Sequence, residues 1–315
     1  MAETLDILAV GETMVMVSPT GGGRLDGSST FVLQPGGAES NVAAHLGRLG
    51  HKAGWASILG EDPLGDLILD SLTADGVDIR NVARDARHPT AVYFKDPTVV
   101  STSVYYYRSG SAASHMSVDD LSRWVASTPK LVHLSGITPA LSESCLRLSK
   151  AIVHDRPFGK ALISFDINHR ERLWNGDAAT ELLALARASD IVFVGRDEAE
   201  NVWGTKDAES IKELIPEPSY LIVKDGSHEA VSFTPSGVFR EPARAVDVVD
   251  VVGAGDGFAA GWLSGLMHDR SEPVRLRMGH GVASRVVQSP TDSADLPPAA
   301  QLAQEASNLT APLRT

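Results

Sequence analysis

The chain has 315 residues, 43% of them hydrophobic and 22% charged, a composition typical of a globular protein with about two domains or one large α/β unit. Lys and Arg number 28 against 40 Asp and Glu, a net charge of −12, which argues against a nucleic-acid or anionic-membrane partner because phosphate would be repelled over most of the surface. The single cysteine, Cys145, excludes an intrachain disulfide, and with neither a basic leader nor an apolar run of roughly 18 residues we expect a cytoplasmic protein.

Short apolar runs alternate with amphipathic stretches of helix length. The runs predict strands at 5–11, 131–134, 161–165, 191–194 and 220–223, and the stretches predict helices at 41–49, 142–154, 178–188 and from about 297 onward. A strand–helix–strand rhythm of this length predicts an α/β fold with a mostly parallel sheet and helices on both faces. Ligands of such sheets bind at the carboxyl ends of the strands.

Two segments break this rhythm and predict a second, smaller sheet. Residues 13–18 with 29–33, and 91–95 with 102–108, read as short β segments separated by Gly, Pro and Asp turns. They could form a lid over a site or be ordinary edge hairpins. We assign 13–35 and 90–112 to the β lid, and 1–12, 36–89 and 113–315 to the α/β core.

The most informative motif is Asp250-Val-Val-Gly-Ala-Gly-Asp256-Gly-Phe-Ala-Ala-Gly261. A glycine-rich turn that opens a helix points backbone N–H groups outward and forms an anion hole, here from Gly253, Ala254 and Gly255. A carboxylate inside that hole would repel a phosphate that is merely bound. Asp256 therefore predicts a base that faces a hydroxyl attacking the phosphate. The alternative is a structural turn in which Asp256 caps the helix.

Competing motifs fail on particular residues. Phe258 stands where a dinucleotide-binding G-x-G-x-x-G needs glycine, and Gly159-Lys160 is followed by Ala161 rather than the Ser or Thr of a P-loop. The sequence has neither an H-E-x-x-H nor a C-x-x-C motif.

The chain resembles the ribokinase-like (PfkB) carbohydrate kinases in two signatures more than two hundred residues apart. Gly253-Ala-Gly-Asp256 is similar to the family's catalytic signature, and Gly36-Gly-Ala-Glu-Ser-Asn41, continuing to Gly50, is similar to its sugar-binding signature. The resemblance implies a three-layer α/β sandwich with a small β-sheet lid. It also implies ATP- and Mg²⁺-dependent phosphorylation of a sugar or related alcohol, and it leaves a monovalent cation requirement open.

Two arginines indicate a negatively charged substrate. Arg108 lies in the expected lid and Arg170 follows a core strand, and the guanidinium fork matches a carboxylate; the alternative for each is a solvated surface charge. Within the family, the segments around Glu39 and Arg108, and residues 133–141 and 165–174, are similar to those of 2-keto-3-deoxygluconate kinases. These kinases act on the terminal hydroxyl of a sugar acid to give the 6-phosphate. By that resemblance the pocket is lined by Gly37, Asn41, Tyr93, Tyr106, Arg108, Ile137 and Arg170. Tyr93 and Tyr106 could instead be aromatics that only pack the lid.

The nucleotide side is less typical of the family. By resemblance, Lys224, Gly226, Gly253 and Gly255 contact ATP, and Glu198 holds Mg²⁺ through water, although Gly195 replaces the family's asparagine. Lys224 could contact phosphate or lie on the surface. Exposed edges of the lid favour a homo-oligomer. A kinase of neutral sugars such as fructose, and a non-catalytic sugar-binding regulator on the same fold, are the alternative functions.

Overall fold

A mostly parallel sheet forms the centre of the molecule. The computed structural model describes residues 4–20, 23–97, 102–289 and 294–309. The large sheet has nine strands in the order β13-β12-β11-β10-β9-β8-β1-β4-β5, and β1, β4, β5, β8, β9, β10 and β11 run parallel to their neighbours while β12 and β13 are antiparallel. The bounds are β1 Ile7–Val10, β4 Ala53–Gly60, β5 Asp78–Asp85, β8 Leu131–Ser135, β9 Leu162–Asp166, β10 Ile191–Gly195, β11 Tyr220–Asp225, β12 Glu229–Thr234 and β13 Gly237–Pro242.

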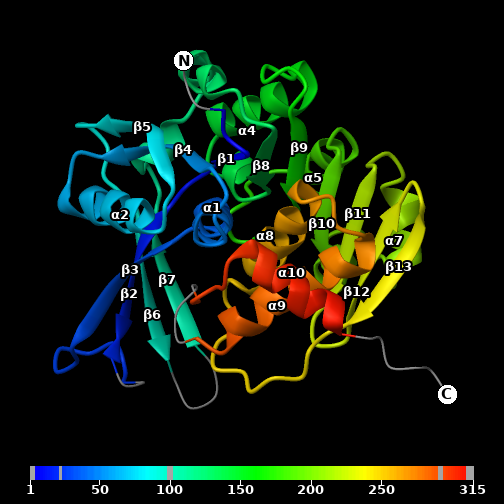
Figure 1. The fold of residues 1–315 in the computed structure, drawn as a ribbon. Helices are drawn as coiled ribbons and strands as arrows, with labels where there is room; N and C mark the ends of the chain where they lie inside the picture. The colour runs from blue at the N-terminus through cyan, green and yellow to red at the C-terminus, as the bar shows by residue number, and fades with distance from the viewer. Residues whose placement is uncertain (1–3, 21–22, 98–101, 290–293, 310–315) are drawn as a thin grey trace.

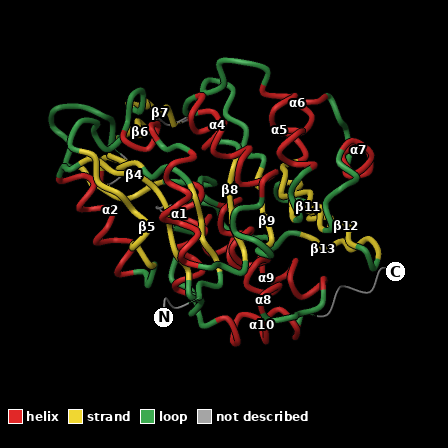
Figure 2. The backbone as a smooth tube through the Cα atoms, turned by 90° about the horizontal axis from the view of Figure 1, so that it is seen from above, coloured by secondary structure: helices red, strands yellow, loops and turns green. Residues whose placement is uncertain are grey.

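Helices cover both faces of this sheet, as the alternating pattern predicts (Figures 1 and 2). Ile7 and Ala9 of β1 pack into one apolar cluster and Leu8 and Val10 into the other, because successive side chains of a strand point to opposite faces. The first face carries α1 Ala38–Arg48, α2 Pro63–Ala74, α8 Ala254–Met267, α9 Glu272–Val287 and α10 Ala299–Asn308; the second carries α3 Leu121–Trp124, α4 Glu143–Lys150, α5 Ala178–Arg187, α6 Arg196–Trp203 and α7 Ala208–Leu214. The predicted three-layer α/β sandwich is confirmed.

A separate four-stranded sheet lies beside α1 and α2 and extends away from the large sheet in Figure 1. Its strands, in the order β3-β2-β6-β7, are β2 Met14–Pro19, β3 Phe31–Gly36, β6 Val92–Pro97 and β7 Thr102–Tyr107. We call it the small sheet. The pairing register places Met16, Tyr93 and Tyr106 on one face, and Val17, Phe94 and Tyr105 on the other.

Glycines set the helix boundaries next to the predicted site. Gly253 has φ +79° and immediately precedes α8, a conformation that favours glycine. α1 begins at Ala38, three residues before the predicted start at 41, because Gly37 is extended and Glu39 already lies in the first helical turn. Gly50, with φ +93°, follows the end of this helix. Among the described residues, no helix is both long and apolar enough to cross a membrane.

Candidate active site

Asp256 and Asn41 meet although 215 residues separate them in the chain. Asp256 lies in the first turn of α8 and is buried. Its Oδ2 accepts a hydrogen bond of 2.9 Å from Nδ2 of Asn41 on α1. The capping alternative for Asp256 finds no support, because the side chain bonds Asn41 and the residue at the N-cap is Gly253, without a side-chain cap. The two predicted signatures therefore converge on one carboxylate.

The surroundings of Asp256 favour its protonated form. Burial raises the pKa of Asp256 to about 8. The hydrogen bond from Asn41 opposes this rise, the charge of Asp166 adds to it, and Lys224 and Arg170 oppose it. A carboxyl group whose pKa lies near neutrality can hold and release a proton at physiological pH, as acid–base chemistry requires.

Backbone donors lie at the start of the same helix. The N–H of Ala254 donates to the carbonyl of Val251 at 3.3 Å, and the N–H of Gly257 to that of Gly253 at 2.9 Å. Among the described residues, the N–H groups of Gly255 and Asp256 have no backbone acceptor. Of the predicted donors, Ala254 is thus already engaged, and an anion arriving here would meet the N–H groups of Gly255 and Asp256 at the positive end of the helix dipole.

Lys224 brings an ammonium group to this helix end. It lies near the carboxyl end of β11, and its Nζ is 2.8 Å from Oδ2 of Asp166, the last residue of β9. A Cβ atom placed on Gly255 would lie 3.3 Å from the same Nζ. Burial alone would lower the pKa of Lys224, but the charges of Asp166 and Glu198 outweigh it and raise that pKa. With its side chain 18% exposed, Lys224 does not fit the surface alternative.

Glu198 is engaged in local structure at the start of α6. One carboxylate oxygen accepts the backbone N–H of His169, and the other accepts that of Gly195 at 3.1 Å. Burial raises the pKa of Glu198, and the charge of Asp166 raises it further. Glu198 and Asp166 thus lie close enough to interact, and Lys224, which pairs with Asp166, partly compensates their two charges.

This region fits a magnesium ion held mainly by other ligands. Among the described residues, no group of three or more His, Cys, Asp or Glu side chains could hold a metal by itself. Mg²⁺ accompanying a nucleotide takes one or two carboxylates together with phosphate oxygens and water. Glu198 and Asp166, each with lone pairs beyond its present hydrogen bonds, are the carboxylates that fit this demand.

A buried carboxyl group supports one side of the predicted sugar pocket. Oε1 of Glu39 accepts from Oγ of Ser135 at 2.8 Å and from Oγ1 of Thr138 at 2.7 Å. These two residues flank Ile137, a predicted pocket residue that is partly exposed.

Gly37, another predicted pocket residue, precedes α1, and a Cβ on it would lie 2.4 Å from the carbonyl oxygen of Glu12. Glycine is therefore required by the close approach of the two backbones.

The small sheet contributes the aromatic residues of the prediction. Tyr93 and Tyr106 are opposite each other on β6 and β7, and their ring centroids are 5.6 Å apart. Tyr93 is buried against Gly36, where a Cβ would lie 2.3 Å from the tyrosine hydroxyl oxygen. Tyr106 is 52% exposed. Tyr93 therefore packs the sheet, whereas Tyr106 offers an open ring on the same face.

The two arginines differ in their surroundings. Arg108 is 13% exposed and pairs with the buried carboxylate of Glu12. Arg170 is exposed, and its Nη1 donates a hydrogen bond of 3.5 Å to the carbonyl oxygen of His169. Its charge opposes the rise in the pKa of Asp256.

Gly226, one of the residues predicted to contact the nucleotide, lies exposed in the turn between β11 and β12, with φ +50°.

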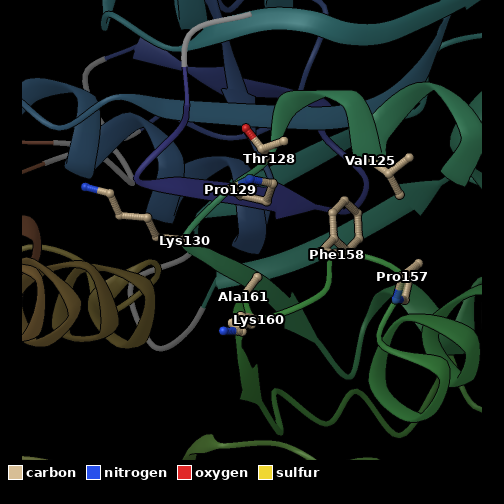
Figure 3. A pocket seen from close by; sticks show the side chains of 8 residues that line it. All are labelled: Val125, Thr128, Pro129, Lys130, Pro157, Phe158, Lys160 and Ala161. Carbon is tan, nitrogen blue, oxygen red and sulfur yellow. The ribbon is translucent and has the colours of Figure 1, made fainter.

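A cavity of about 500 Å³ lies elsewhere (Figure 3). Lys130 and Ala161, which line it, directly precede β8 and β9, so it opens at the amino ends of these strands. Asp166 and Lys224 lie at the opposite, carboxyl ends. The lining includes two lysines but no carboxylate or imidazole: Val125, Thr128, Pro129, Lys130, Pro157, Phe158, Lys160 and Ala161. It therefore lies apart from the carboxylates of the candidate site.

Sequence reasoning missed three buried carboxyl groups that shape the site. Glu12 lies two residues after the end of β1, and Asp166 is the last residue of β9. Both therefore lie at the sheet edge where ligands bind, and this position could have revealed them. Glu39 was noted only within a signature. Its role depends on Ser135 and Thr138, which lie 96 and 99 residues away, so no local pattern indicates it.

Comparison with known proteins finds similar sequences and structures over most of the chain. The family model described as pfkB family carbohydrate kinase matches residues 4–299. The chain is 36% identical over 306 residues to the 2-dehydro-3-deoxygluconokinase of Bacillus subtilis (strain 168), covering 95% of this chain and 94% of that one. It is similar to the crystal structure of a PfkB protein from Polaromonas sp. JS666, with 32% identity, a TM-score of 0.84 and coverage of 95% and 99%. An uncharacterized sugar kinase from Pyrococcus horikoshii in complex with ATP shares the fold at 24% identity, with a TM-score of 0.81 and coverage of 95% and 99%.

Proposed function

The chain belongs to the pfkB family of carbohydrate kinases, and from this premise we propose that it transfers the γ-phosphoryl group of ATP to the terminal hydroxyl of 2-keto-3-deoxygluconate, giving the 6-phosphate. The contact between Asp256 and Asn41 carries the proposal, because it joins the two signatures at one carboxylate. The named relative from Bacillus subtilis supports the choice of a sugar acid. The uncharacterized sugar kinase from Pyrococcus horikoshii, which shares the fold, is in complex with ATP, and this supports ATP as the donor in the proposal.

Asp256 is the proposed base. Its carboxylate accepts the proton of the sugar hydroxyl as that oxygen attacks the γ-phosphorus and the bond to the leaving ADP oxygen breaks. Asn41 holds Oδ2 from the α1 side, which leaves Oδ1 to face the hydroxyl. Burial raises the pKa of Asp256 to about 8, and Lys224 and Arg170 oppose this rise, so their charges favour the ionised form that the reaction needs.

Positive charge gathers where the phosphoryl group would pass. The N–H groups of Gly255 and Asp256 point outward from α8, and Lys224 lies against Gly255. Donors held in place before the reaction stabilise developing charge without reorganisation. Mg²⁺, when bound, neutralises charge on the phosphates, and Glu198 and Asp166 would hold it, partly through water. A requirement for a monovalent cation stays a separate proposal, tested by exchanging K⁺ for Na⁺.

A neutral-sugar kinase is the second candidate, and one observation favours it. Arg108 already has a carboxylate partner in Glu12, so the pocket carries less net positive charge than two free arginines would provide. A coupled assay of ATP consumption with 2-keto-3-deoxygluconate, fructose and ribose separates the candidates. We expect kcat/KM for the sugar acid to exceed the other values by at least about 100-fold, which corresponds to roughly 2.7 kcal/mol. Equal or better turnover of fructose would favour the second candidate, and binding without turnover would favour a regulator.

The small sheet supports the proposal of a homo-oligomer. The register places Phe31, Leu33, Tyr105 and Tyr107 on the face opposite Tyr93, and these side chains are 36%, 46%, 49% and 64% exposed. An exposed apolar face of this kind is suited to packing against a second copy. We propose that the enzyme is cytoplasmic, and sedimentation velocity in a buffer of cytoplasmic pH and ionic strength should report a dimer or a larger species. A monomer would refute the proposal of a homo-oligomer.

A further inference from the structure

A buried carboxylate lies directly behind Arg108. Glu12 follows β1, and its side chain has no exposed surface. Nε of Arg108 donates to Oε2 of Glu12 at 2.7 Å, and Nη2 contacts the same oxygen. The hydroxyl of Ser111 donates to Oε1. Glu12 thus engages two residues, Arg108 and Ser111, at the start of the segment that leads from β7 of the small sheet to β8 of the large one.

The contact uses only part of the arginine fork. A guanidinium has five N–H donors in one plane, and Glu12 takes those on the Nε side. Among the described residues, Nη1 of Arg108 has no hydrogen-bond partner. The Tyr106 ring lies 5.9 Å from the Cζ atom of Arg108. Glu12 therefore fixes the guanidinium while the outer edge, formed by Nη1 and Nη2, stays open to a second carboxylate.

The charges of this pair cancel, whereas that of Arg170 does not. In the described part of the chain, no carboxylate pairs with Arg170, which is exposed. A sugar acid would therefore meet one oriented but neutralised arginine and one arginine with its full charge. The first supplies geometry, and the second supplies most of the attraction for an anion.

We propose that Glu12 is a positioning residue of the sugar pocket, which orients Arg108 toward the substrate carboxylate and at the same time limits its electrostatic pull. The inference rests on the proposed function, because it needs a sugar acid as ligand. Such a device favours release of a charged product as well as binding of a charged substrate, since part of the positive charge is always compensated. A purely structural clamp between the two sheets is the competing explanation.

Two substitutions of Glu12 separate orientation from charge. Glu12→Gln keeps an oxygen that accepts from Arg108 but removes the negative charge. Glu12→Ala removes both, so that the guanidinium is no longer held. Under the proposal the two variants change the affinity for the sugar acid in opposite directions, whereas loss of a structural clamp changes it in the same direction. Glu241→Gln is the matched control, because Arg277 and Glu241 form a similarly buried pair between α9 and β13.

The test is calorimetric titration of the full-length wild type and these three variants with 2-keto-3-deoxygluconate, together with the thermal midpoint of each protein. We expect Glu12→Gln to lower Kd by about 3- to 10-fold and Glu12→Ala to raise it by at least about 10-fold. Glu241→Gln should change the thermal midpoint but leave Kd within about twofold.

Each outcome decides a different point. If Glu12→Gln and Glu12→Ala both weaken binding, or if Glu241→Gln weakens it equally, Glu12 is a clamp and the inference is overturned while the proposed function stands. If the wild type itself does not bind the sugar acid, the proposed function is overturned and the inference with it. Opposite shifts in Kd, with the control unchanged, support the positioning role.

Discussion

Replacing Asp256 by Asn should make the protein more stable while removing its activity. The variant keeps the shape of the side chain and an oxygen that accepts from Asn41, but it cannot ionise. The pKa of Asp256 rises from an ordinary value of 3.8 to about 8 in the folded protein. Between these values the folded state binds the proton more tightly than the unfolded state, so the stability of the wild type falls as pH increases.

The magnitude follows from this shift. Each pH unit within the window removes about 1.4 kcal/mol from the wild type, which amounts to on the order of 4 kcal/mol at pH 7. At roughly 2 °C per kcal/mol for a chain of this size, Asp256→Asn should raise Tm by about 8 °C at pH 7 and by little near pH 4. The same substitution should lower kcat by about 10³-fold, because the base is lost.

Thermal unfolding of the ligand-free proteins at pH 4, 5, 6, 7 and 8 checks the expectation. Asp70→Asn, a substitution of an exposed aspartate on α2, is the matched control and should leave the pH dependence of Tm unchanged. A difference between Asp256→Asn and wild type that stays constant from pH 5 to pH 8 would refute the raised pKa. Near-normal turnover of the variant would refute the role as base.

Three further predictions concern other parts of the molecule. Lys224→Met leaves Asp166 without its ammonium partner and should lower kcat by about 10²-fold, measured at saturating ATP; an unchanged kcat would remove Lys224 from the phosphoryl path. Arg170→Ala should raise KM for a sugar acid by at least about 10-fold and leave KM for fructose within about twofold; equal effects on both sugars contradict the carboxylate role. Gly261→Ala should destabilise the fold by about 1–3 kcal/mol despite the better helix propensity of alanine, because its Cβ would lie 2.4 Å from the carbonyl oxygen of Met278 on α9; an unfolding titration that shows higher stability would contradict this.

Five inner strands of the large sheet, β1, β8, β9, β10 and β11, could be predicted from the sequence, whereas the inner strand β4 and the strands β5, β12 and β13 were not predicted. β8, β9 and β10 are short apolar runs because both of their faces are covered by helices. β5, Asp78–Asp85, is mostly polar and lies at the edge of the sheet, where the apolar signal is weak. The start of α1 was misplaced because its first turn contains Glu39 and Ser40, polar residues that are buried for reasons outside the helix.

The candidate site likewise has one part that the sequence predicts and another that it does not. The helix at Asp256 could be predicted from its glycines, since a turn with positive φ leads into α8. The partner of Arg108 could not, because Glu12 lies 96 residues away and no pattern around either residue indicates the pair. The sequence predicts Arg108 as a contact of the substrate carboxylate or as a solvated surface charge, and the fold gives it a buried partner in Glu12. Local sequence indicates which groups can react, whereas the charge balance among them depends on contacts between distant segments.

The central claim is that Asp256 faces the hydroxyl that receives the phosphoryl group. A crystal structure of the enzyme with 2-keto-3-deoxygluconate and a non-hydrolysable ATP analogue tests it most directly. The account predicts a carboxylate oxygen of Asp256 within about 3.2 Å of the terminal hydroxyl of the sugar. The hydroxyl oxygen should lie between this carboxylate and the γ-phosphate. A sugar bound with this hydroxyl beyond hydrogen-bond reach of Asp256 would contradict the account.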